Sequence, residues 1–396
     1  MTRGGSGILL ATVVALLAGA SCDTSGPPNR RASAAPMPVA WHEVSLPPPA
    51  GAAGRLAPRD AITCGGRWYV VGAVVSADGA THPAAWSSSD ARRWRTLRLT
   101  PRTPYGEVAI LYAAGCRVGQ LAAIGAQSGG AHGNPRVTQW YLLADGILDE
   151  VPAGLDLYGG SEAVNVGRIV GGPAGWLIVG NRVFGGAAWT STDATAFRPV
   201  GRVPGLASDG GLTTLAVDAA AYRGGWVVVG SGRRAGRAGS DPLAWTSTDG
   251  RRWRRVPVGD ATGDRYRVLQ RVTMNGDALL AAGVDGDRFA AWTMNGGAWR
   301  LAGRFGALRE GGSVQQVQGV AATGGRLWAA ATDGRAYGLW ASPDGGRTWR
   351  PTQTPIPIAA GGADRVVTVT GAGTDLLLVA DDGRHGRAWV TNRAAG

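Results

Sequence analysis

The stretch ASPDGGRTWR at residues 341–350 is a short polar turn flanked by two tryptophans, Trp340 just before it and Trp349 within it. Looser copies occur as SSSDARRWR at 87–95 and TSTDGRRWR at 246–254. A tryptophan that precedes such a turn recurs about every 50 residues, a period typical of solenoids and propellers. These tryptophans are Trp86, Trp140, Trp189, Trp245, Trp292, Trp340 and Trp389.

An apolar run stands upstream of each of these tryptophans, such as WYVVG at 68–72 and WVVVG at 226–230. The runs are short, rich in small and β-branched residues, and mostly bounded by glycine, which predicts buried strands. Another apolar stretch precedes each run, and an aromatic-led stretch follows most of the polar turns. Each copy therefore predicts four strands, named A to D in chain order, with the polar turn joining C to D.

A four-stranded unit of this kind has two apolar faces that neighbouring units must cover. Radial packing of seven copies covers both faces, so the sequence predicts an all-β fold, a seven-bladed β-propeller over residues 39–396. We expect the 16 tryptophans to lie in its core, because they fall at the heads of strands B, C and D. The seventh copy lacks strand D, whereas VAWHEVSL at 39–46 resembles a strand D with nothing before it. We therefore expect this N-terminal strand to complete the last blade and close the ring.

Residues 1–22 resemble a lipoprotein-type signal peptide. The apolar run ILLATVVALLA at 8–18 is too short to span a bilayer permanently, and GASC, ending at Cys22, resembles a bacterial lipobox. Gly19 stands where that family prefers leucine. In the family the cysteine carries the lipid, so we expect anchoring at Cys22 to the outer face of the cell membrane. Ordinary secretion is the alternative, and residues 23–38 have the composition of a flexible tether.

Cysteine use and charge limit the expected partners. Cys64 and Cys116 occupy similar places in neighbouring copies, which in an exported chain favours a disulfide over the alternative, a metal site. The formal net charge is +12, and all 40 basic residues are arginines spread along the chain. That spread lacks the stripe or tail of a nucleic-acid-binding protein and suits anionic lipid headgroups or cell-wall polymers. We expect no nucleic acid, no cofactor and a monomer.

The stretch SPDGGRTW at 342–349 resembles the Asp-box of bacterial neuraminidase repeats, S-x-D-x-G-x-T-W, at every fixed position. The other copies are looser: Asp90, Asp193 and Asp249 lie four residues before their aromatic residue, and Asn295 replaces the aspartate in the fifth copy. The resemblance implies a propeller of the sialidase-like superfamily. There the box is a structural turn whose carboxylate accepts local backbone N–H groups, away from the active site.

The same resemblance supplies an alternative function, that of a divergent sialidase-like glycoside hydrolase. Such enzymes use three arginines on the substrate carboxylate, a tyrosine nucleophile activated by a glutamate, and an acid/base aspartate. Nothing like the family's early F/Y-R-I-P motif precedes the first copy of the turn here. Tyr105 with Glu107, and Tyr158 with Glu162, are sequence neighbours, whereas the family's pair comes from distant blades. We predict no catalytic residue.

A carboxylate stands near the start of strand A in every copy. Since strand A lines the central channel of a propeller, we interpret this set as an acidic collar that holds a cation or a basic group. The alternative is that strand starts simply favour aspartate. The set is Asp60, Glu107, Glu162, Asp209, Asp264, Glu310 and Asp364.

Three copies have longer B–C loops. These loops carry His82, His132, Arg233, Arg234 and Arg237, either as a functional lip or as tolerated insertions. The sequence predicts a binding or scaffold module for a glycan, a peptide or an envelope protein.

Overall fold

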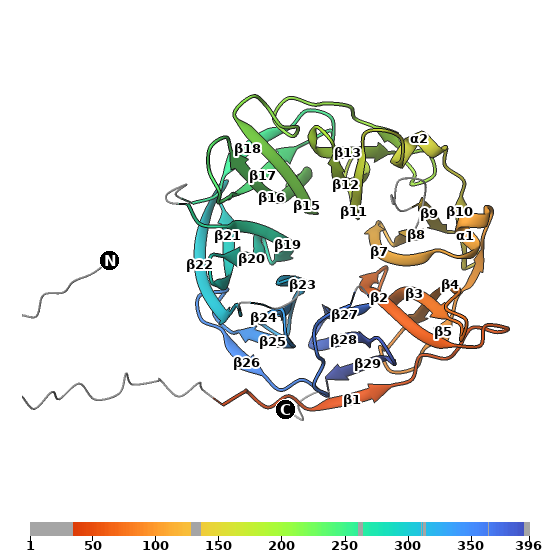
Figure 1. The fold of residues 1–396 in the computed structure, drawn as a ribbon. Coiled ribbons are helices and arrows are strands. Elements are labelled where there is room, and N and C mark those ends of the chain that lie inside the picture. Colours follow the sequence, from red (N-terminus) through yellow and green to blue (C-terminus); the bar gives the residue numbers. More distant parts are fainter. Residues whose placement is uncertain are drawn as a thin grey trace, which may run out of the picture. The chain divides into compact units, whose positions relative to one another are not determined.

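Seven β-sheets are arranged around a central axis in the structure, a computed structural model (Figure 1). It describes residues 35–127, 136–259, 264–309, 311, 314–362 and 364–391. The ring belongs to the unit Pro36–Gly396, and Met1–Ala35 is a separate unit. Cys22 and the expected signal peptide lie outside the described residues. No helix in the described part has the length and apolar character needed to cross a membrane.

Each sheet is one blade, and its strands follow one another outward from the axis. Blade 1 comprises β2 (Arg55–Cys64), β3 (Arg67–Val75), β4 (Thr81–Ser88) and β5 (Arg95–Thr96); blade 2 comprises β7 (Ile110–Arg117), β8 (Gln120–Gln127), β9 (Arg136–Leu142) and β10 (Ile147–Val151). Blade 3 comprises β11 (Ala163–Gly172), β12 (Gly175–Arg182), β13 (Gly185–Ser191) and β14 (Arg198–Pro199); blade 4 comprises β15 (Leu212–Tyr222), β16 (Gly225–Arg234), β17 (Asp241–Ser247) and β18 (Arg254–Pro257). Blade 5 comprises β19 (Arg267–Asn275), β20 (Ala278–Asp285), β21 (Arg288–Asn295) and β22 (Ala298–Ala307); blade 6 comprises β23 (Gln316–Thr323), β24 (Arg326–Thr332), β25 (Tyr337–Ser342) and β26 (Arg350–Thr352). Blade 7 comprises β27 (Arg365–Ala372), β28 (Asp375–Asp382) and β29 (Gly386–Thr391), completed by β1 (Trp41–Val44).

The innermost strands contact their neighbours all the way round the axis, from β2 through β7, β11, β15, β19 and β23 to β27 and back to β2. The predicted seven-bladed ring is therefore confirmed. Its closing strand is confirmed too, because β1 pairs antiparallel with β29, Trp41 opposite Thr391 and Val44 opposite Ala388. Met37 also contacts blade 6: its backbone N–H donates to the Pro351 carbonyl at 2.8 Å.

The tryptophans of the third strands fill the space between blades. Six of these seven are buried and Trp340 is half-buried. They lie toward the end of the strand rather than at its head. Three of them, Trp86, Trp189 and Trp245, donate their indole N–H to carbonyls of the preceding D–A connections at 2.7 Å. Each of these rings therefore packs in the core while its one polar group bonds the chain that links neighbouring blades.

Aspartates hold the turns between the third and fourth strands. The Asp344 carboxylate accepts the backbone N–H of Arg347 at 3.1 Å and that of Thr348 at 2.9 Å. Asp90, Asp193 and Asp249 accept backbone N–H groups of their own turns in the same way. The Thr348 backbone N–H is the main cause that lowers the pKa of Asp344 to about 2. In the same turn the Ser342 hydroxyl donates to the Asp344 carboxylate and the Trp349 indole N–H donates to the Gly346 carbonyl, both at 2.9 Å, so a serine, an aspartate and an aromatic residue recur together.

Blades 1 and 2 are joined by an added strand, which the repeat pattern does not predict, and by the disulfide that the places of the two cysteines do predict. The chain leaves blade 1 as β6 (Arg98–Thr100), which pairs parallel with β10 and becomes a fifth strand on blade 2. A disulfide links Cys64, at the end of β2, to Cys116 in β7, with Cα atoms 5.4 Å apart. Two short helices, α1 (Pro104–Glu107) and α2 (Leu155–Tyr158), lie in the connections of the described chain on either side of blade 2.

Candidate functional site

Register shifts in the innermost strands place polar side chains in the central channel. In blade 4 the pairing of β15 with β16 shifts between Ala216 and Asp218, and β2, β7, β11, β19 and β23 carry corresponding shifts. A β-bulge inserts one extra residue, so that consecutive side chains turn toward the same side. The channel residues at or next to these shifts are Arg59, Asp60, Tyr112, Arg168, Asp218, Arg271 and Gln318.

A glycine in the second strand makes room for most of these bulges. Gly230 lies opposite Ala216, and a Cβ atom on it would come within 1.8 Å of the Leu215 carbonyl oxygen. At Gly283 the corresponding distance to the Val268 carbonyl oxygen is 1.9 Å. No side chain fits at such distances, so the glycine that ends each of these apolar runs is required by close backbone approach.

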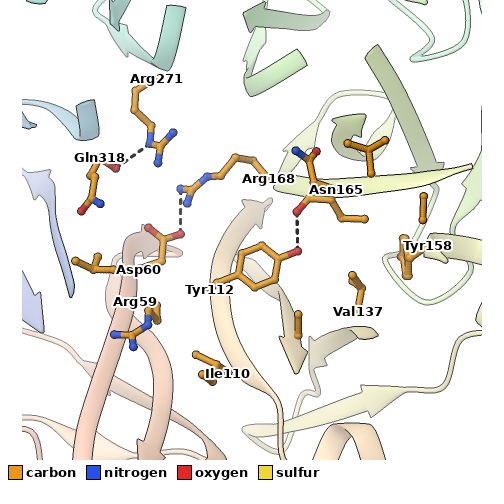
Figure 2. A pocket seen from close by; sticks show the side chains of 15 residues that line it. Arg59, Asp60, Ile110, Tyr112, Val137, Tyr158, Asn165, Arg168, Arg271 and Gln318 are labelled. Atoms are coloured by element: carbon orange, nitrogen blue, oxygen red, sulfur yellow. Dashed lines mark hydrogen bonds and ion pairs between the residues drawn. The ribbon is translucent and has the colours of Figure 1, made fainter. Parts of the chain in front are cut away.

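A cavity of about 390 Å³ lies at one end of the channel. We call it the central cavity. Its walls come from the beginnings of β7, β9, β11 and β27 and from the end of β8, so it opens on the face that carries the D–A and B–C connections. Figure 2 shows polar side chains gathered on one side of it. The polar floor is Arg59, Asp60, Asn165, Arg168, Arg271 and Gln318. The opposite wall is mostly aliphatic, with Ile110, Ala126, Val137, Ala163, Val164 and Val166 beside Tyr112 and Tyr158.

Arg168 is the centre of an ion network in the floor. Its Nη2 lies 3.0 Å from Oδ2 of Asp60, and its Nε lies 3.7 Å from Oδ1 of Asp218. Both carboxylates also accept backbone N–H groups of neighbouring blades, Asp60 from Ala114 at 2.9 Å and Asp218 from Val272 at 3.0 Å. Burial alone would lower the pKa of the Arg168 guanidinium, but the two carboxylates raise it. At Asp218, burial raises the pKa of the carboxyl by more than the positive charge of Arg168 lowers it, so this pKa lies above its usual value.

Arg271 faces this network without an ion pair of its own. Its Nε donates to the Gln318 carbonyl at 2.8 Å and its Nη1 to the Gln270 carbonyl at 2.6 Å. No carboxylate oxygen of the described residues lies within 4.0 Å of its guanidinium. Burial and then the positive charge of Arg168 lower the pKa of Arg271. Figure 2 shows the guanidinium groups of Arg168 and Arg271 extended toward one another.

Arg59 is held at the edge of the floor by a different carboxylate. Its Nη1 lies 2.5 Å from Oδ2 of Asp381, whose side chain is fully buried and also pairs with Arg55. Two arginines thus share one aspartate. The floor and its edge together carry a surplus of positive charge.

The charged floor divides the channel into two parts. Beyond it lies a second space of about 230 Å³, the lower chamber, lined by the later residues of the innermost strands. Asp60, Arg168, Arg271 and Gln318 line both spaces. A ligand that enters from the D–A face therefore meets these four side chains before it reaches the lower chamber.

The predicted acidic collar is not what the structure shows, because its described members do not meet in one cavity. Only Asp60 lines the central cavity, within β2 rather than before it. Glu107 lines a separate groove of about 700 Å³ together with His82. The remaining described members lie in connections before the innermost strands: Glu162, Asp209 and Asp264 are exposed, and Asp364 is half-buried. Glu310 lies outside the described residues.

Several of these carboxylates serve local structure instead. Asp209 pairs with Arg255 at 3.2 Å, and Asp264 accepts the Gly239 N–H at 2.7 Å. The connections that carry them differ in length and path, so equal places in sequence do not become equal places around the axis. No group of three or more His, Cys, Asp or Glu side chains suited to a metal ion occurs in the described part of the chain.

Two tyrosines lie in the cavity wall: Tyr158, which the sequence placed near Glu162, and Tyr112, which the sequence did not single out. The Tyr112 hydroxyl donates to the Val166 carbonyl at 2.8 Å, and the Tyr158 hydroxyl donates to Oε1 of Gln139 at 2.6 Å. Burial raises the pKa of both phenols. Tyr158 therefore bonds an amide rather than the Glu162 carboxylate, and neither phenol is prepared to lose its proton.

Comparisons with known proteins give the fold and no family. No protein-family model matches the sequence, and no curated protein matches it. The extracellular domain of a putative hybrid two-component system from B. thetaiotaomicron is similar at a TM-score of 0.50 with 9% identity, over 90% of this chain and 40% of that one. The β-propeller domain of the Trilobed protease from Pyrococcus furiosus aligns at 0.48 with 13% identity, over 86% and 94% of the two chains. Trypanosoma rangeli sialidase in complex with the inhibitor DANA aligns at 0.42 with 12% identity, over 86% of this chain and 55% of the sialidase.

Proposed function

We propose that the chain is an exported, lipid-anchored propeller that binds a ligand with the face carrying the D–A and B–C connections. The observation that supports this most is the central cavity, an apolar pocket with a few converging polar groups, which is the usual form of a ligand site. Val164 stands at its mouth with 47% of its surface exposed. The expected partners are a glycan, a peptide or an envelope protein.

A matched pair of variants tests the binding face. Val164→Arg places a long charged side chain at the mouth of the cavity. Val118→Arg makes the same change at another exposed valine, in the turn between β7 and β8 at the opposite end of β7. The full chain is applied to a glycan array and a peptide library. Binding that is lost in Val164→Arg and kept in Val118→Arg supports the proposal. Equal binding by both variants contradicts it.

The anchor is tested separately. Cys22→Ser removes the sulfur that would carry the lipid, so the variant should move from the membrane fraction to the medium. Retention in the membrane fraction would argue against lipidation at this position.

A sialidase-like hydrolase is the second candidate, because one cavity gathers arginines, a tyrosine and an aspartate. Against it, the Tyr112 phenol donates to a backbone carbonyl and has a raised pKa, whereas a nucleophile needs a nearby base to take its proton. A fluorogenic sialoside decides between the candidates. Turnover that disappears in Tyr112→Phe, which removes the hydroxyl of a tyrosine lining this cavity, would favour the hydrolase.

A further inference from the structure

The floor of the central cavity offers hydrogen-bond donors that the described residues leave unused. In Arg168, Nη2 lies 3.0 Å from Asp60 and Nε lies 3.7 Å from Asp218. In Arg271, Nε and Nη1 donate to two backbone carbonyls. Nη1 of Arg168 and Nη2 of Arg271 have no partner among the described residues. A guanidinium has five N–H donors and accepts nothing, so these groups are free to donate to an acceptor that enters the cavity.

Electrostatics specifies the charge of that acceptor. Arg168 and Arg271 extend toward one another in Figure 2. Burial and then the charge of Arg168 lower the pKa of Arg271, while the carboxylates of Asp218 and Asp60 offset this only in part. Two positive charges that face each other across a partly dry cavity repel, and an anion between them removes the repulsion. Bidentate arginine contacts suit a planar carboxylate or a phosphate.

The rest of the cavity specifies what carries the anion. Facing the floor are the methyl groups of Ile110, Val137, Val164 and Val166, with alanines between them. Of the aromatic residues in this wall, Tyr112 and Tyr158 have their hydroxyls already bonded within the protein. Such a wall favours an aliphatic group and gives few partners to sugar hydroxyls. A side pocket of about 40 Å³ shares Val137 and Tyr158 with the cavity, but Arg136 and Glu150 also line it, so the aliphatic wall ends there.

We propose that the central cavity binds a carboxylate attached to a small branched aliphatic group, with the carboxylate between Arg168 and Arg271 and the aliphatic group against the Ile110–Val137–Val164 wall. This inference rests on the proposed function and names its ligand class. Two sources share this chemistry: a free short-chain acid, and the C-terminal residue of a peptide such as one ending in valine. In the peptide, the preceding residues would leave the cavity at Val164.

The test compares an acid with its neutral amide in isothermal titration calorimetry on the full chain. The probes are isovalerate against isovaleramide, and a tripeptide ending in free valine against the same tripeptide amidated. We expect each acid to bind at least tenfold more tightly than its amide. We expect Arg271→Met to reduce acid binding to the level of the amide. Arg251→Met removes one exposed arginine from the turn between β17 and β18, on the face opposite the cavity mouth, and should leave binding unchanged.

Two further variants guard against a folding defect. Arg271→Lys keeps the charge but loses the forked donors, so acid binding should weaken less than in Arg271→Met. Ala163→Phe fills the cavity and leaves every charge in place, so the branched acids should no longer bind. A peptide acid that binds tenfold better than isovalerate identifies a chain terminus as the source, and equal affinities identify the free acid.

Equal affinity for acid and amide, or wild-type acid binding by Arg271→Met, would overturn the inference. Such a result leaves the proposed function standing if a glycan or peptide still binds in a way that Val164→Arg abolishes. If Val164→Arg abolishes nothing, the proposed binding face itself is wrong.

Discussion

Removal of Arg168 should destabilise the protein strongly at neutral pH. The guanidinium lies 3.0 Å from Asp60 and 3.7 Å from Asp218, whose side chains are only 4% and 8% exposed. At an effective dielectric constant of about 20, charges about 4 Å apart attract by about 4 kcal/mol. Breaking a buried pair by deleting one partner costs about 3–5 kcal/mol, because the other charge stays buried without compensation. We therefore expect Arg168→Met to lose about 3–5 kcal/mol of unfolding free energy at pH 7.

The loss should shrink as the pH falls. Burial already raises the folded-state pKa of Asp218 above its usual value, so ionisation of this group opposes folding above that pKa. Without Arg168 the pKa rises further. The added penalty is then fully present at pH 7 and disappears as the pH falls through the raised pKa, where the carboxyl takes up a proton in the folded state.

Urea unfolding followed by tryptophan fluorescence at pH 7 and pH 5 measures both effects. Arg233→Met serves as the control for loss of one arginine, and adding Asp60→Asn and Asp218→Asn to Arg168→Met should restore most of the lost stability. A loss below about 1 kcal/mol, where exposed pairs lie, would refute the reasoning. So would a loss of equal size at both pH values.

Three other changes probe the fold. Gly230→Ala should lower the free energy of unfolding by at least about 3 kcal/mol, because the new Cβ would meet the backbone of β15. The control Gly210→Ala, whose Cβ would have no atom within 4 Å, should stay near wild type. Equal effects of the two variants in urea unfolding would contradict the role given to the bulge glycine. Val44→Asp puts a charge into the buried side of the closing strand and should cost at least about 2 kcal/mol; an unchanged thermal midpoint would show that β1 does not hold the ring shut. Replacing Cys64 and Cys116 together by serine should cost about 2–4 kcal/mol; a reducing agent that lowers the midpoint of the double variant as much as that of the wild type would contradict this.

The fold could be predicted from the sequence because each blade solves the same packing problem with the same residues. Trp86 and its six counterparts fill equivalent inter-blade spaces, and Asp344 shows why its turn recurs. The closing strand followed from a strand D present at one end and missing at the other. These features are local, so a repeat of about 50 residues displays them directly.

The site could not be predicted in the same way. Among the described residues of the expected collar only Asp60 lines the central cavity, and the charged residues beside it, Arg168, Asp218 and Arg271, come from blades 3, 4 and 5. Each follows a one-residue bulge, which breaks the alternation by which a strand residue is assigned to a face. The glycines opposite the bulges were visible in the sequence as ends of apolar runs. These glycines were therefore the feature of the sequence that could have located the bulges, and with them the residues that face the channel.

The pairing of β1 with β29 gives translation an unusual constraint. Residues 41–44 leave the ribosome well before residues 386–391, because the other six blades lie between them in the sequence. Throughout that interval the first strand has no sheet to join, and the blade at each end of the growing array keeps one apolar face uncovered. A chain that stops before blade 7 therefore leaves β1 without its partner strand β29 and leaves the ring open.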